Sequence, residues 1–145
     1  MNYYLKATEK YLYNYNSLKA SIENMQKEIT EMEYAGMSAM DPAHVPSKTY
    51  KYHSPSEDEA IRIAEKKTVL QKRIESTQGK LERIDRAIEA LSEVERRIIT
   101  ERYIQCRPWW EVAYSAKYNE RWCREIRQRA VRKIAIGLFG EEVLQ

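Results

Sequence analysis

The chain has 145 residues, of which 25 are Lys or Arg and 22 are Asp or Glu, and it contains only two cysteines. Two cysteines do not make a disulfide framework, and no apolar stretch resembles a signal peptide or approaches the ~20 residues of a membrane span. We therefore expect a cytoplasmic protein. With only four Gly and four Pro to interrupt helices, the composition favours an all-α fold.

The charges are distributed unevenly along the chain. Residues 1–90 hold 14 basic and 14 acidic side chains, whereas residues 91–134 hold 11 basic and six acidic ones. A basic C-terminal part indicates a polyanionic partner at that end, and the alternative is a basic face exposed only to solvent.

The first predicted helix covers residues 2–35. Its apolar and aromatic side chains follow a spacing of 4 and 3 from Tyr11 onward, as in the contact stripe of a coiled coil. The stripe consists of Tyr4, Tyr11, Tyr15, Leu18, Ile22, Met25, Ile29 and Met32. Gly36 is expected to end this helix.

Residues 36–56 are predicted to be a linker, because three prolines, Pro42, Pro46 and Pro55, disfavour helix. His44 and His53 lie in it without a nearby cysteine, so we expect no metal site. Ser56 and Glu59 form a capping-box pattern that starts the next helix.

The second long helix is predicted over residues 57–91, again with one apolar stripe. Its members are Ile63, Leu70, Ile74, Leu81, Ile84, Ile88 and Leu91, with Lys67 and Thr77 as polar positions. Residues 1–91 are therefore expected to form a long, coiled-coil-like antiparallel hairpin. The same stripes also fit pairing with a second copy of the chain, and the thin core of a two-helix hairpin favours a homodimer.

A domain over residues 92–145 is predicted to contain a helix-turn-helix. A capping box at Ser92 and Glu95 starts a helix over 92–104, Pro108 precedes a short helix over 109–117, and Asn119 caps a last helix over 120–138. The inner face of the last helix is formed by Cys123, Ile126, Ala130 and Ile134. Its other faces carry Arg121, Arg124, Arg127, Arg129, Arg132 and Lys133.

The segments LSEVERRIITERYI (91–104) and EVAYSAKYNERWCREIRQRAVRKI (111–134) resemble region four of bacterial sigma factors. Glu111-Val112-Ala113 is similar to the Glu-Ile-Ala of that family, and Asn119 occupies its capping position. Lys117 departs from the family, which has a glycine at this point of the turn. With the preceding helices, the whole chain looks like the phage-encoded late-gene activators of the RinA and ArpU type.

This resemblance implies a sequence-specific regulator of transcription that binds double-stranded DNA, with no catalytic residue, metal or cofactor. The implied base readers are Glu120, Arg121, Arg124 and Glu125, and Asn119 is a further implied DNA-binding residue. The implied phosphate contacts are Arg127, Arg129, Arg132 and Lys133, for which exposure to solvent is the alternative. Trp122 either contacts DNA or packs on the preceding helix. The resemblance also implies RNA polymerase as a partner of Ile98, Ile99 and Tyr103, for which a core role is the alternative. Trp109, Trp110 and Tyr103 are expected in the core, and Cys123 as a small buried residue.

Two other functions fit the same pattern. A phage small terminase, which is a DNA-packaging adaptor, also joins a helix-turn-helix to helices that oligomerise. A helical scaffold whose basic end never meets DNA is the third reading. The sequence contains no nucleophile motif, phosphate-binding glycine loop or zinc spacing, so we do not expect an enzyme.

Overall fold

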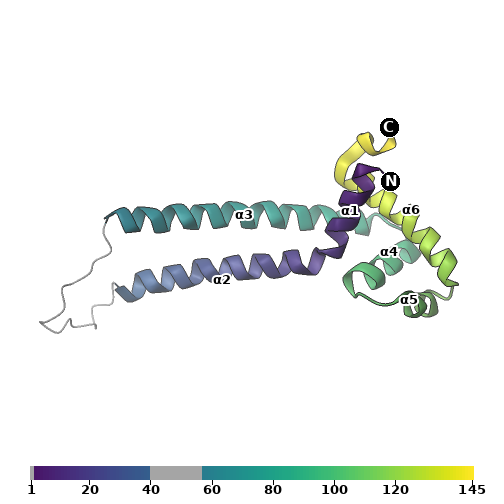
Figure 1. The fold of residues 1–145 in the computed structure, drawn as a ribbon, viewed down its shortest axis with the longest axis horizontal. Coiled ribbons are helices and arrows are strands. Elements are labelled where there is room, and N and C mark those ends of the chain that lie inside the picture. The colour runs from purple at the N-terminus through teal and green to yellow at the C-terminus, as the bar shows by residue number, and fades with distance from the viewer. Residues whose placement is uncertain (1, 40–56) are drawn as a thin grey trace, which may run out of the picture. The chain divides into compact units, whose positions relative to one another are not determined.

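The computed structural model describes residues 2–39 and 57–145, which are helical and contain no strand (Figure 1). The all-α prediction is therefore confirmed. The elements in chain order are α1 (Tyr3–Tyr13), α2 (Tyr15–Ala39), α3 (Glu57–Glu89), α4 (Glu93–Ile99), the π-helical turn η1 (Thr100–Ile104), α5 (Trp109–Ala116), α6 (Glu120–Phe139) and the 3-10 turn η2 (Gly140–Leu144). None of these helices is long and apolar enough to cross a bilayer.

The chain forms two compact units. One consists of Ala20–Thr77, and the other combines Met1–Lys19 with Gln78–Gln145. The unit that holds α4, α5 and α6 thus also includes α1 and the end of α3, whereas the sequence suggested a boundary at residue 91. The predicted histidine pair and most of the predicted linker lie outside the described residues.

In the unit formed by Ala20–Thr77, α2 and α3 are joined by ion pairs of Lys66 with Glu28 at 3.2 Å and of Lys67 with Glu33. The stripe residues Ile22, Leu70 and Ile74 are buried. Ile63, which was predicted on the same stripe, is 47% exposed.

The first predicted helix is interrupted at Asn14. The Asn14 backbone N–H and the Asn14 side-chain amide both donate to the carbonyl of Lys10, at 3.2 and 2.7 Å. An asparagine that bonds the backbone in this way competes with regular helix hydrogen bonding, and α1 ends at Tyr13. Gly36 does not end the helix as expected, because α2 continues to Ala39.

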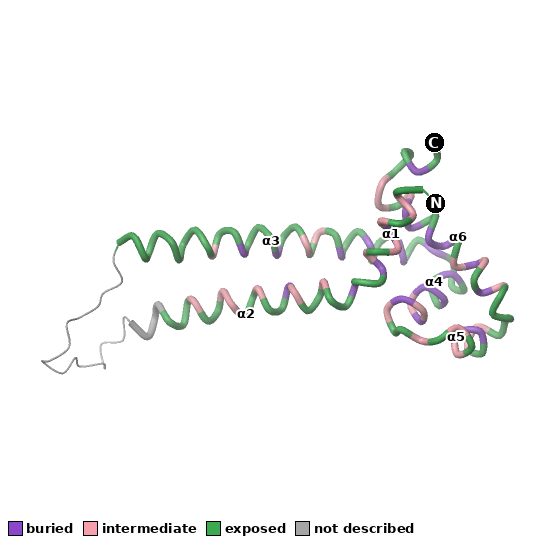
Figure 2. The backbone as a smooth tube through the Cα atoms, in the orientation of Figure 1, coloured by how far each residue is buried: buried purple, intermediate pink, exposed green. Residues whose placement is uncertain are grey.

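The second unit has its core between α1, the end of α3, α4 and α6, and buried positions recur along α4 and α6 (Figure 2). Ile98, Ile99 and Ile134 have no exposed surface. The core also depends on a small residue in α6, because a Cβ added at Gly137 would lie 3.0 Å from the Cβ of Ala87. A larger side chain at this position would push α6 away from α3.

The helix predicted over 92–104 instead changes to the π-helical turn η1 after Ile99. The turn places two polar side chains in the interior. Tyr103 is 1% exposed and donates to Glu9 of α1, while Glu101 is 8% exposed and accepts from Ser115 of α5 at 2.7 Å and from Arg107 at 3.2 Å. This turn therefore connects α4 with both α1 and α5.

The turn between α5 and α6 has the predicted cap at Asn119. Lys117 adopts the left-handed conformation with φ 61° and ψ 33°. The side chain of Asn119 accepts a hydrogen bond from the backbone N–H of Trp122 at 2.7 Å, which caps α6 as expected. Lys117, the residue in this left-handed conformation, stands where the sigma region-four family has glycine.

We predict that Lys117→Gly stabilises the protein. A left-handed residue with a Cβ costs roughly 1–2 kcal/mol, and glycine adds about 0.4–1 kcal/mol of entropy to the unfolded chain. The free energy of unfolding in urea should therefore rise by roughly 0.5–1 kcal/mol. Lys117→Ala keeps the Cβ and serves as the control without this gain. Equal stability of the two variants would contradict the prediction.

Candidate nucleic-acid interface

The inner face of α6 packs against α4 and α5. Cys123 and Ile126 of α6 form a cluster with Ile98, Val112 and Ala113, and Trp109, Ala116 and Trp122 pack against its edge. All four residues predicted on the inner face are buried, which confirms that prediction; they are Cys123, Ile126, Ala130 and Ile134. Burial raises the pKa of the Cys123 thiol, in keeping with the expected role as a small buried residue.

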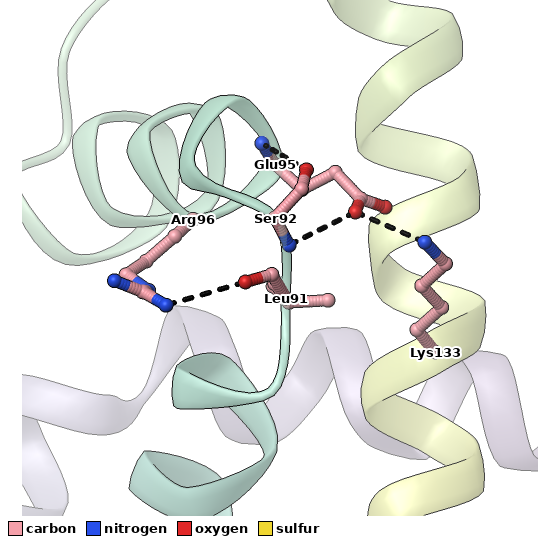
Figure 3. A network of polar contacts seen from close by, with 5 residues as sticks. All are labelled: Leu91, Ser92, Glu95, Arg96 and Lys133. Carbon is pink, nitrogen blue, oxygen red and sulfur yellow. Dashed lines mark hydrogen bonds and ion pairs between the residues drawn. The ribbon is translucent and has the colours of Figure 1, made fainter.

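A second attachment of α6 lies at the start of α4 (Figure 3). Ser92 and Glu95 form the predicted capping box, with the Ser92 N–H donating to Glu95 Oε1 at 3.1 Å. Lys133 of α6 donates to the same oxygen at 3.0 Å. Lys133 was expected to bind phosphate, but this ion pair gives it a structural role between α4 and α6.

The pKa of Glu95 reflects these contacts. Burial by itself would raise the pKa of this carboxyl, but the hydrogen bonds from Ser92 and Lys133 outweigh burial and lower the pKa below its usual value. The charged form of Glu95 therefore stabilises the folded state.

Arg127 points toward α1. Its guanidinium donates to Glu9 Oε1 at 3.1 Å, and the hydroxyl of Tyr103 donates to the same oxygen at 3.2 Å. The Arg127 and Glu9 side chains are only 22% and 20% exposed. Arg127 therefore fastens α6 to α1, a role that the sequence did not indicate because nothing local marks Glu9 as its partner.

The basic side chains between residues 91 and 134 fall into two groups, those that bind groups of their own chain and those that are exposed. Within the described residues, six of the eleven bind a carboxylate or a backbone carbonyl of their own chain at 2.9–3.3 Å; they are Arg96, Arg97, Arg102, Arg107, Arg127 and Lys133. The other five are Lys117, Arg121, Arg124, Arg129 and Arg132, and all five are exposed. Four of these five lie on α6.

Three of the exposed positions belong to one stripe of α6. Arg121, Glu125, Gln128 and Arg132 are spaced by 4, 3 and 4 residues, so they lie on one side of the helix, and we call them the outer stripe. The Arg121 side chain is 92% exposed and only loosely paired with Glu125, at 3.9 Å. Gln128 is exposed and was not singled out from the sequence, although its spacing could have identified it.

Two tryptophan rings hold the remaining arginines. The guanidinium of Arg129 lies 5.3 Å from the ring centroid of Trp122. Arg124 lies 5.6 Å from the Trp109 centroid, with Arg102 and Arg127 also near that ring at 4.8 and 5.8 Å. Cation–π contacts of this kind restrict the directions of flexible side chains.

Other expected site residues have mixed outcomes. Trp122 packs against the cluster of α4 and α5, which supports the core alternative for this residue. Asn119 uses its side chain to cap α6, and Glu120 is exposed beside it. Trp110 was expected in the core but is 65% exposed, so that prediction is wrong.

The residues considered for polymerase contact are all interior. Ile98, Ile99 and Tyr103 are at most 1% exposed, so they have the core role that was the alternative. Burial also raises the pKa of Tyr103 well above its usual value.

The structure thus defines an all-α protein with a capped C-terminal helix that exposes four arginines. Residues 5–136 match the family model described as "Protein of unknown function (DUF722)", and the chain belongs to this family. A search of curated proteins and a search of solved structures each found no match.

We predict that Glu95 makes stability depend on pH. Its folded pKa lies below the unfolded value of about 4.3, so its contribution is present above that pH and is lost as pH falls through the folded pKa. The difference in unfolding free energy between wild type and Glu95→Gln should be larger at neutral pH than in acid. Glu93→Gln, an exposed carboxyl in the same turn, is the matched control. An equal difference at both pH values would exclude this role.

We predict that the Glu9–Arg127 contact contributes to stability. Removing either charge leaves the other largely buried without its ion-pair partner, so Glu9→Gln and Arg127→Gln should each cost about 1–3 kcal/mol of unfolding free energy. The double variant should cost less than the sum of the two. Additive losses in this double-mutant cycle would show that the two side chains do not act together.

Proposed function

We propose that this protein is a sequence-specific regulator of transcription that binds double-stranded DNA through α6. It would act in the manner of the sigma-region-four-like activators of phages that the sequence resembles. The observation that carries the proposal is the sorting of basic side chains. Those facing the protein are paired within the chain, while Arg121, Arg124, Arg129 and Arg132 are exposed on α6.

The dimensions of α6 suit the major groove. A 20-residue helix is about 30 Å long, and the groove is about 12 Å wide and accepts a helix. The first turn of α6 follows directly on the tight turn at Lys117 and Asn119. In helix-turn-helix proteins the second helix follows such a turn and reads bases with its first residues, which supports the proposal.

The chemistry of the exposed side chains divides into two roles. Arg121 and Arg124 near the start of α6 can bind guanine with two hydrogen bonds, and Glu120 or Glu125 can accept from cytosine. Gln128, further along the outer stripe, has the amide that pairs with adenine. Arg129 and Arg132 lie further along the helix and are assigned to phosphates.

A homodimer belongs to the same proposal. In the unit formed by Ala20–Thr77, Ile61 and Val69 lie on one side of α3 and are 51% and 47% exposed. Burying these two side chains against a second copy would stabilise the pair, since each Å² of apolar surface removed from water contributes about 25 cal/mol. A dimer would place two copies of α6 on two half-sites of DNA.

We predict that Arg121→Ala and Arg124→Ala each weaken binding to a duplex selected from a random pool by about 1–3 kcal/mol, or roughly 5- to 150-fold. Each should also relax the preference for one base. Fluorescence anisotropy at fixed salt measures the affinity. Arg86→Ala removes an exposed arginine of α3 outside α6 and is the matched control. Unchanged affinity in both α6 variants would refute α6 as the reading helix.

A further inference from the structure

A cleft of about 350 Å³ lies between α1 and α6, within the unit that contains both helices. Leu5 and Glu9 of α1 form one wall. The other wall belongs to α6 and includes Arg127, Gln128, Arg129 and Arg132. A cleft with three arginines on one wall is a place where an anion is favoured.

The charge in the cleft is not cancelled by its acidic member. Glu9 Oε1 accepts from Arg127 and from Tyr103, so the negative charge of Glu9 is paired with one of the three arginines. Arg132 has no acidic partner among residues 2–39 and 57–145. The positive charges of Arg129 and Arg132 therefore remain for a ligand.

Two further features support an anion in this cleft. The guanidinium of Arg129 lies 5.3 Å from the ring centroid of Trp122, so a ring beside the cleft restricts the direction of this arginine. Leu5 and the buried Val131 supply apolar lining, and charges attract each other more strongly beside apolar surface than in open water.

We propose that the α1–α6 cleft binds a phosphate group through Arg129 and Arg132. Guanidinium groups match phosphate oxygens with paired hydrogen bonds, which a single ammonium group cannot do. The phosphate is either part of a DNA backbone or a free phosphoryl group. If the phosphate belongs to a DNA backbone, this inference rests on the proposed function.

The position of the cleft on α6 fits a backbone phosphate. Arg132 follows Arg121 by 11 residues, which is about 16 Å along a helix. The major groove is about 12 Å wide, so a helix that reads bases near Arg121 has reached the edge of the groove near Arg132. The first helix α1 would then be part of the DNA-binding surface.

The test uses the full chain and the variant Arg132→Gln, with Arg86→Gln as an exposed arginine outside the cleft. On DNA, the cleft variant should weaken affinity about equally for all sequences and reduce the slope of log affinity against log salt by about one. The selected consensus should not change. If wild type binds DNA and this variant keeps the wild-type affinity and slope, the cleft proposal fails while the proposed function stands.

A second arm distinguishes the source of the phosphate. Inorganic phosphate is titrated into the protein while the arginine Nε–Hε signals are followed by NMR. Saturable shifts at Arg129 and Arg132 that Arg132→Gln abolishes support the phosphate site, even if wild type does not bind DNA. If wild type binds neither DNA nor inorganic phosphate at this cleft, the phosphate site is refuted together with the proposed function.

Discussion

The seating of α6 on the rest of its unit is the constraint on which the other features depend. Apolar contacts of Cys123 and Ile126 with α4 and α5 fix one side of the helix. Two ion pairs, Lys133 with Glu95 and Arg127 with Glu9, fix it at α4 and at α1. None of these attachments uses Arg121, Arg124, Arg129 or Arg132, so these exposed arginines stay available for a partner.

This arrangement explains how a region with a modest excess of positive charge presents a concentrated basic surface. Six basic side chains bind carboxylates or backbone carbonyls of the same chain. Three of them, Arg107, Arg127 and Lys133, pair with carboxylates, and a charge paired in this way contributes little to attraction at a distance. The exposed arginines of α6 and Lys117 lie along one helix and its preceding turn, where their positive charges add together.

Much of the C-terminal fold could be predicted because its signals are local. The capping box at Ser92, the cap at Asn119 and the 3- and 4-residue spacing of Cys123 to Ile134 each depend on neighbours in the sequence. The π-helical turn, the partner of Arg127 and the interior place of Glu101 could not be predicted, because each depends on residues of another helix. Asn14 lies between these two cases. Its side chain bonds the Lys10 carbonyl and the helix is interrupted there, although the regular apolar spacing predicted one continuous helix.

The most direct test of the central claim is the salt dependence of wild-type binding to duplex DNA. If the exposed arginines of α6 contact phosphates, a plot of log affinity against log salt should be linear with a slope of roughly −2 to −4, since each phosphate contact contributes about −0.9. Binding that does not change with salt, or no binding at low salt, would contradict a nucleic-acid role for the outer side of α6.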